Sequence, residues 1–312
     1  MAPVRFAGSN DGPRLTVAQA LKSPTFIPER TLRTMENQFL VDGLLRQGPP
    51  ANSGAIAYRE NQSLFADDDP AIIEEYGEIP VIGTSRGALK TVHTVKRGAA
   101  LMVSREMRDR NNVDELNQRQ RMVRNTFVRA YDKLFMSAVL GDAGIQTFAA
   151  TAVWLTALST NDVIRKDIAK AVGLVEDAVP SPAVDNGESY LGFEADTLVI
   201  STTMGVNFLN NDAVNAVFAG GDIASESLKY TGKLPRKFFG LDVVRARALN
   251  GKNKAIIMQR GTAGFISDEY PLEATEMYED RPRQAWRSDF TRRSVAALDN
   301  PKAVVVVTGV ES

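Results

Sequence analysis

The chain has 312 residues, of which 44% are hydrophobic and 24% are charged, and its formal net charge is −1. This is the composition of an ordinary globular protein, and the near-neutral charge argues against a chain that coats nucleic acid over its whole surface. The absence of cysteine excludes disulfides, thiolate metal sites and cysteine nucleophiles. No apolar run is long enough to span a bilayer, and the first residues lack the apolar region of a signal peptide.

Catalytic motifs are missing from the sequence. The single histidine, His93, excludes multi-histidine metal sites and lies in an alternating stretch, where a strand-face side chain is its simplest interpretation. There is no phosphate-binding loop, no G-x-S-x-G elbow and no dinucleotide fingerprint. We therefore expect no enzyme, no cofactor and no bound metal. An enzyme that uses only carboxylates, lysines or serines remains the least favoured alternative.

The first 54 residues are interrupted by proline at positions 3, 13, 24, 28, 49 and 50. Short helices are predicted around Leu15–Lys22 and Glu29–Leu40, but apolar residues are too sparse for an independent core. This segment is either a disordered tail or an extended arm that becomes ordered on neighbouring chains.

A strand is predicted over Gly54–Arg59, followed by a long polar connection that reaches Arg86. Connections of this length are uncommon in a compact domain unless they are functional. Residues 59–80 carry seven acids and one base, for a net charge of −6, whereas residues 86–110 carry seven bases and two acids, for a net charge of +5. A run of carboxylates like this one is more often a surface that faces solvent or a partner than a catalytic pair.

A strand and then one long helix are predicted between Leu89 and Gly141. Alternating β-branched residues indicate the strand. Asn112 is a good N-cap with Glu115 three residues later, and Gly141 is a plausible residue just past the C-terminus. Apolar residues then recur at helical spacing, namely at Val113, Leu116, Val123, Phe127, Tyr131, Leu134 and Ala138. A helix of about 40 Å with one apolar stripe and arginine-rich faces must pack one side on a flat surface.

The rest of the chain predicts alternating elements. Helices are expected over 162–174 and 203–218, and strands over 195–201, 234–249, 254–261, 273–278, 286–297 and 303–308. Five arginines in the last third (Arg281, Arg283, Arg287, Arg292 and Arg293) stand against Asp289. With one tryptophan nearby, they are only weak support for nucleic-acid contact.

The stretch TVKRGAALMVSREMRDRNNVDEL, which leads into the long helix, resembles the major capsid proteins of tailed bacteriophages with the Hong Kong 97-like fold. The order LPRKFFGLDVV before KAIIMQRGTAGFISDEYPL agrees with that resemblance. The resemblance implies an α+β fold whose parts follow one another along the chain. These parts are an N-terminal arm (1–54), an extension loop with its base strands (55–104), the spine helix of the peripheral domain (105–145), an axial domain (146–268), and peripheral-domain strands with the C-terminal strand (269–312).

The resemblance implies a structural coat protein that assembles into an icosahedral head around double-stranded DNA. Its expected partners are copies of itself in hexamers and pentamers, a portal, scaffold or decoration proteins, and packaged DNA through non-specific contact, but no membrane. Assembly is expected in the bacterial cytoplasm, and the mature site is the virion. Some relatives carry an N-terminal scaffolding segment, but from the length of this chain we expect none. An encapsulin-type compartment shell is the nearest alternative, although encapsulins generally lack a proline-rich arm of this kind.

Charged residues at the expected interfaces are the candidate inter-subunit contacts. They are Asp67, Asp68, Asp69, Glu74, Glu75, Glu78, Arg86, Lys90, Arg105, Arg108, Arg119, Arg124, Arg283, Arg287 and Arg292. Some relatives join an extension-loop lysine to an asparagine of a neighbour. Lys90 could be the donor, but no asparagine lies between Tyr270 and Asp299, and Asn300 belongs to an Asn-Pro turn. We therefore expect a shell without covalent cross-links.

Overall fold

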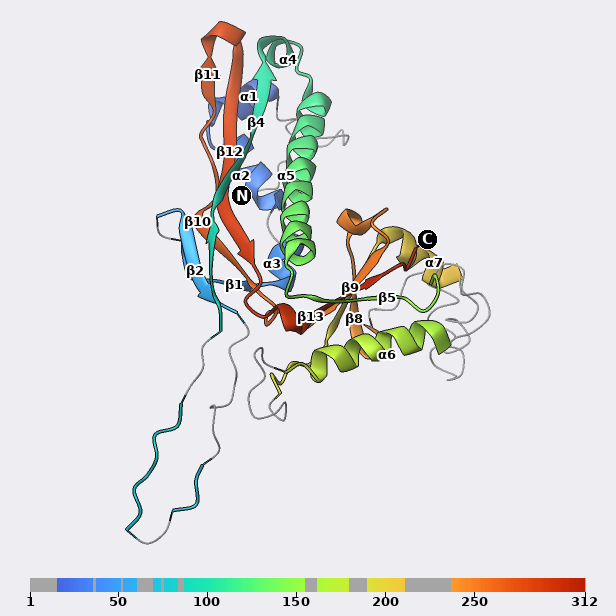
Figure 1. Cartoon of the computed structure of the whole chain (residues 1–312). Helices are drawn as coiled ribbons and strands as arrows, with labels where there is room; N and C mark the ends of the chain where they lie inside the picture. The colour runs from blue at the N-terminus through green and yellow to red at the C-terminus, as the bar shows by residue number, and fades with distance from the viewer. Residues whose placement is uncertain are drawn as a thin grey trace.

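Two sheets and one long helix organise the computed structural model of the chain (Figure 1). The structure describes residues 16–35, 38–51, 53–60, 70–73, 76–83, 87–154, 162–179, 190–210 and 237–311.

The long helix, α5, spans Val113–Gly141, as the apolar spacing predicts. The Asn112 side chain accepts a hydrogen bond from the backbone N–H of Glu115 at 3.4 Å, and this cap fixes where the helix begins. Gly141 is the last helical residue and not the residue after it, because Asp142 takes the extended C-cap position. The buried stripe of α5 is Leu116, Gln120, Phe127, Tyr131, Phe135, Met136 and Val139. Its other faces remain polar, as expected of a helix that packs on one side only.

The first sheet lies along α5 (Figure 1). Its order is β1 (Arg46–Gln47), β10 (Phe265–Ala274), β12 (Ala285–Ala297) and β11 (Tyr278–Asp280), and β4 (Val95–Ser104) also pairs with β12. The β4–β12 ladder is antiparallel and continuous from Ala285 opposite Ser104 to Ser294 opposite Val95. Side chains in the middle of β12 alternate between buried and half-exposed, so one face of this strand meets the core. A short helix, α4 (Arg105–Asp109), joins β4 to α5.

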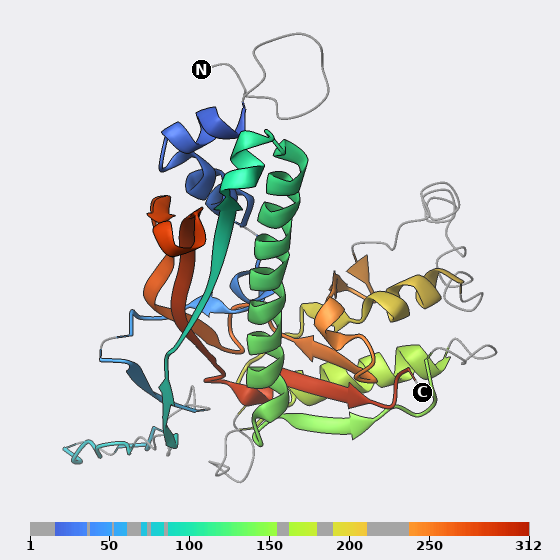
Figure 2. The ribbon, with the colours of Figure 1, turned by 90° about the horizontal axis from the view of Figure 1, so that it is seen from above.

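The described part of the N-terminal segment packs into its own subunit. It forms α1 (Val17–Lys22), α2 (Phe26–Met35) and α3 (Leu40–Leu44), and α2 and α3 lie against α5. Figure 2 shows α1 and α2 near the α4 end of the long helix. The two interpretations offered for residues 1–54, a disordered tail or an arm ordered on neighbours, are therefore wrong for this part. Its apolar residues are few, but they join the core beneath α5 instead of forming one of their own.

The second sheet has the order β5-β13-β9-β6-β8-β7 and is flanked by two helices. The strands are β5 (Gln146–Ala149), β6 (Thr197–Ile200), β7 (Lys237–Phe238), β8 (Leu241–Arg245), β9 (Lys254–Met258) and β13 (Val304–Thr308). The helices are α6 (Asp162–Glu176) and α7 (Thr202–Asn210), and the short 3-10 turns are η2 (Arg247–Leu249), η3 (Arg281–Arg283) and η4 (Pro301–Ala303).

The C-terminal strand is placed differently from the sequence prediction. β13 does not complete the sheet beside α5. It pairs in parallel with β5 and antiparallel with β9, inside the second sheet. All four residues Val304–Val307 are buried. An unbroken apolar run needs strands on both edges and cover on both faces, and the position between β5 and β9 above α6 supplies these.

Candidate assembly surfaces

A two-stranded hairpin carries the long acidic connection away from both sheets (Figure 1). β2 (Ala55–Arg59) pairs antiparallel with β3 (Leu89–His93), from Ala55 opposite His93 to Arg59 opposite Leu89. The described residues between the strands are exposed, and several of them are apolar: Ile72, Ile73, Tyr76, Ile79, Val81 and Ile82. Single exposed apolar residues are normal, but several along one projecting segment mark an interaction surface.

The acidic residues predicted to line this connection are only partly described. Glu78 is described and exposed. Asp67, Asp68, Asp69, Glu74, Glu75 and Arg86 lie outside the described residues.

Lys90 fixes the base of the hairpin to the end of α5. Its ammonium group forms ion pairs with Glu60 and, at 3.3 Å, with Asp142. Partial burial acts to lower the pKa of Lys90, but the hydrogen bond to Glu60 and the charge of Asp142 outweigh it, so the pKa is raised. Lys90 is therefore a protonated structural residue within its own chain.

The arginines around α4 and the first turns of α5 also have partners within the chain. Arg105 lies 3.8 Å from Asp109, and Arg108 donates two hydrogen bonds to Asp109. The Arg108 guanidinium also lies 4.8 Å from the ring centroid of Trp286, a cation–π contact. Arg119 donates to the Glu115 carboxylate at 2.6 Å and to the carbonyl of Met102 at 3.1 Å, which ties α5 to β4.

The tip of the β11–β12 hairpin has a similar arrangement. Arg283 pairs with Asp280 at 3.3 Å, and Arg287 donates to Asp289 at 2.7 Å. The Tyr278 hydroxyl donates a hydrogen bond to the Asp289 carboxylate, and this hydrogen bond raises the pKa of Tyr278.

On α5, Arg124 donates only to its neighbour Asn125, at 3.2 and 3.1 Å. Like the arginines at the β11–β12 tip, it lies at the surface of the subunit, where a neighbouring chain can reach it. Exposed pairs such as these contribute about 0–1 kcal/mol each within the subunit.

Arg292 is not a surface residue, and the prediction that it contacts a neighbour is wrong for this conformation. The residue is only 4% exposed. Its guanidinium makes two 2.9 Å hydrogen bonds to Asp268 and reaches Asp42 at 3.2 Å. It also lies against the rings of Phe39 and Tyr131, at 5.3 and 4.8 Å from their centroids. The alternation of β12 points this arginine inward, where two carboxylates balance its charge.

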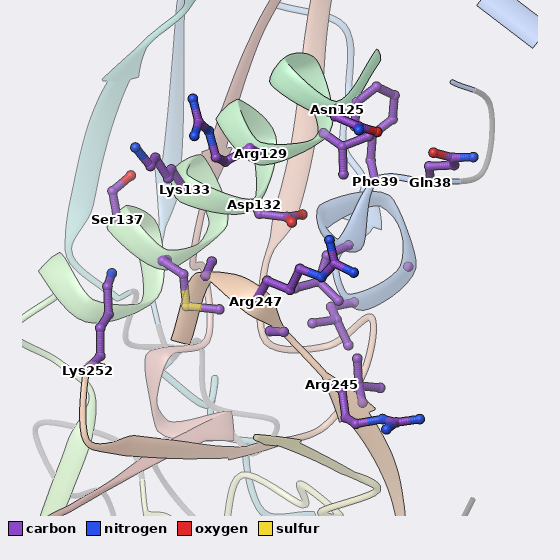
Figure 3. Close-up of a pocket in the computed structure, with 18 of the residues that line it drawn as sticks. Gln38, Phe39, Asn125, Arg129, Asp132, Lys133, Ser137, Arg245, Arg247 and Lys252 are labelled. Carbon is purple, nitrogen blue, oxygen red and sulfur yellow. The ribbon is translucent and has the colours of Figure 1, made fainter. Parts of the chain in front are cut away.

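Sequence reasoning missed a cavity of about 1440 Å³ between α5, α3 and the β8–η2 segment (Figure 3). Its polar lining comes from two sides. The α5 side contributes Asn125, Thr126, Arg129, Asp132, Lys133 and Ser137, and the other side contributes Arg245, Arg247, Lys252 and Arg260. The sequence signal that could have indicated this cavity is the recurrence of polar residues at every fourth position along α5. The contribution of η2 was not predictable, because it depends on how the second sheet sits against the helix.

Within the part of the chain that the structure describes, no helix is both long and apolar enough to cross a membrane. The same residues contain no cluster of three or more acidic or histidine side chains arranged to hold a metal ion.

The layout of a long helix on an extended sheet, a projecting hairpin and a second sheet with flanking helices is the Hong Kong 97-like shell fold. The structure is similar to that of Mycobacterium phage Che8, with a TM-score of 0.55, 11% identity, and coverage of 100% of this chain and 98% of that chain. It is also similar to the capsid of Myoviridae phage XM1, with a TM-score of 0.54, 9% identity, and coverage of 98% and 96%. A virus-like particle from Pyrococcus furiosus gives a TM-score of 0.55 at 11% identity, with coverage of 90% and 97%. No curated protein matches the chain.

The family model for phage capsid proteins matches residues 88–307. The chain therefore belongs to the phage capsid protein family and is a shell-forming coat protein of the virion.

Proposed function

We propose that the chain is the major subunit of an icosahedral phage head that encloses double-stranded DNA. Subunits associate as hexamers and pentamers in the bacterial cytoplasm, around a portal and together with scaffold or decoration proteins. No reaction is catalysed. The observation that carries this proposal is the projecting β2–β3 connection, where the isolated subunit leaves Ile72, Tyr76 and Val81 almost wholly in solvent.

In the proposed shell this connection lies on an adjacent subunit. The fully exposed Ile72, Tyr76 and Val81 supply apolar contact area, and the acidic residues of the loop add charge complementarity to basic surfaces. The partly exposed arginines of α4, α5 and the β11–β12 tip are the candidate ion-pair partners of these acidic residues. Each such contact is weak, but a closed shell repeats it in every subunit, so the sum is large.

Cryo-electron microscopy of the purified protein tests this proposal. The expected result is a closed shell with the connection of one subunit resting on the next. A small oligomer of fixed size, or a shell in which the loop contacts only its own subunit, would contradict it.

A further inference from the structure

The helix α5 presents a regular line of exposed polar side chains. Arg121, Asn125, Arg129, Lys133 and Ser137 follow one another at every fourth residue, and all five are exposed. Four residues of helix rise about 6 Å, so the line advances in steps of roughly that length along one face. None of the three cations in it has an ion pair with an acid of the described residues.

A second group of cations lines the 1440 Å³ cavity together with Arg129 and Lys133 of this line. Arg245, Arg247, Lys252 and Arg260 stand on β8, η2 and the turns beside β9. Figure 3 shows Arg129 and Lys133 on the helix, with Arg245, Arg247 and Lys252 on the other side of the cavity. Only Arg260 is paired among the described residues, and that pair is long, with 3.8 Å between its guanidinium and the Asp242 carboxylate.

We name the cations that line this cavity the basic trough: Arg129 and Lys133 on α5, and Arg245, Arg247, Lys252 and Arg260 on the β8–η2 side. The only acid that lines the cavity with them is Asp132. Six cations therefore line one cavity of a chain whose formal net charge is −1.

Asp132 in the cavity wall and Asp242 beside Arg260 balance at most two of these six charges. Unpaired cations that line one cavity repel one another, and a bound polyanion reduces that repulsion. The trough is therefore arranged to receive negative charge from another molecule.

The rim of the trough favours phosphate over an acidic peptide. A peptide would need exposed apolar residues as anchors, but Phe39, Leu44 and Met136 in the cavity wall are buried, and Met122 is the one large apolar side chain there that is well exposed. DNA backbones, in contrast, are bound by arginine and lysine with help from polar side chains such as Asn125 and Ser137.

We propose that the basic trough binds the phosphate backbone of duplex DNA without sequence preference, and that this face of the subunit is directed toward the inside of the shell. The inference rests on the proposed function, because it assigns the DNA-facing surface of that coat protein. Neither the binding nor its salt dependence requires the shell to have formed.

The test uses unassembled subunits, separated from shells by size exclusion, and a fluorescent 30-base-pair duplex of arbitrary sequence. The trough variant is Arg129→Gln, Lys133→Gln and Arg247→Gln. The control variant, Arg33→Gln, Lys96→Gln and Arg110→Gln, removes the same charge from exposed cations elsewhere. In 50 mM salt the trough variant should bind at least tenfold more weakly than the wild type, and the control less than threefold. The slope of log affinity against log salt should fall by about 2 to 3 in the trough variant only.

Three results would overturn the assignment: no binding of the duplex by the wild type, equal weakening in both variants, or tighter binding of a poly-glutamate peptide than of the duplex. The last result would show that the trough binds an acidic protein segment and not DNA. If the triple variant does not fold, as judged by circular dichroism, the double variant Lys133→Gln and Lys252→Gln replaces it, with the same expectation at about two thirds of the slope change. Electron microscopy of the same preparations reports shell formation separately, so a failure of the coat-protein proposal is distinguishable from a failure of the trough.

Discussion

At the scale of single residues, the charge of Arg292 is the least expected feature of the core. Removing a guanidinium from water is costly, and good geometry with full hydrogen bonding is needed to offset that cost. Arg292 has both, because Asp268 binds it through two hydrogen bonds and two neighbouring aromatic rings pack against it. Through Asp42 and Phe39 it also holds the α3 region against β12.

Replacing Arg292 with methionine should lower the free energy of unfolding by about 3–5 kcal/mol, since the change leaves Asp268 partly buried without its cation. Arg281 is the control, because it pairs with Glu279 at 3.6 Å and both side chains are well exposed, at 86% and 58%. Arg281→Met should cost about 1 kcal/mol or less. Urea denaturation of both variants measures the difference, and equal losses would show that Arg292 is not a core residue.

Asp132 leads to a prediction about pH. Burial raises its pKa in the folded state, while the backbone N–H of Leu40 acts in the opposite direction with a smaller effect. A carboxyl whose pKa is higher in the folded than in the unfolded state lowers stability progressively as pH rises from the unfolded pKa through the folded pKa. Asp132→Asn should therefore raise the melting temperature at pH 7 and have less effect at pH 4. An unchanged difference between wild type and variant from pH 4 to pH 7 would contradict this explanation.

At the scale of elements, the sequence alone predicts a helix or strand correctly where the residues that determine it lie close together in the chain. The N-cap and apolar spacing of α5 predict its span to within one residue, and alternation predicts β12. Alternation cannot say which face of β12 is buried, so Arg287 and Arg292 looked equivalent although the first is at the surface and the second is in the core. Nor could the sequence choose the sheet for β13, because an all-valine run fits any central strand and pairing partners lie far away in the chain.

The exposed connection gives an element-scale prediction. Changing Ile72, Tyr76 and Val81 to serine removes apolar surface that the subunit does not bury, since these residues are 98–101% exposed. The free energy of unfolding of the isolated subunit should therefore change by less than about 0.5 kcal/mol. Shell yield should fall sharply, because the interface loses its apolar contacts. Thermal melts and negative-stain particle counts provide the two measurements, and a normal yield of shells would exclude this loop from the interface.

At the scale of the whole molecule, the two sheets support different surfaces. The sheet along α5 carries the hairpin and most of the candidate contacts between subunits, whereas the second sheet contributes the far wall of the basic trough. Acidic residues concentrate on the projecting connection and unpaired cations concentrate around the cavity. A subunit with a near-zero net charge thus presents oppositely charged faces, which orients weak contacts during association.

How the shell is held together follows from the chemistry of Lys90. An isopeptide bond forms when a neutral amine attacks a side-chain amide, with loss of ammonia. Lys90 forms ion pairs with Glu60 and Asp142, and its raised pKa keeps the amine protonated. The sequence also has no asparagine between Tyr270 and Asp299, and the Asn300 amide donates to the carbonyl of Thr262 at 2.8 Å in its turn. Boiled particles should therefore give a single band near 34 kDa on denaturing electrophoresis. The result that contradicts this expectation is a ladder of multimers that survives boiling, and its disappearance in a Lys90→Arg variant would identify Lys90 as the donor after all.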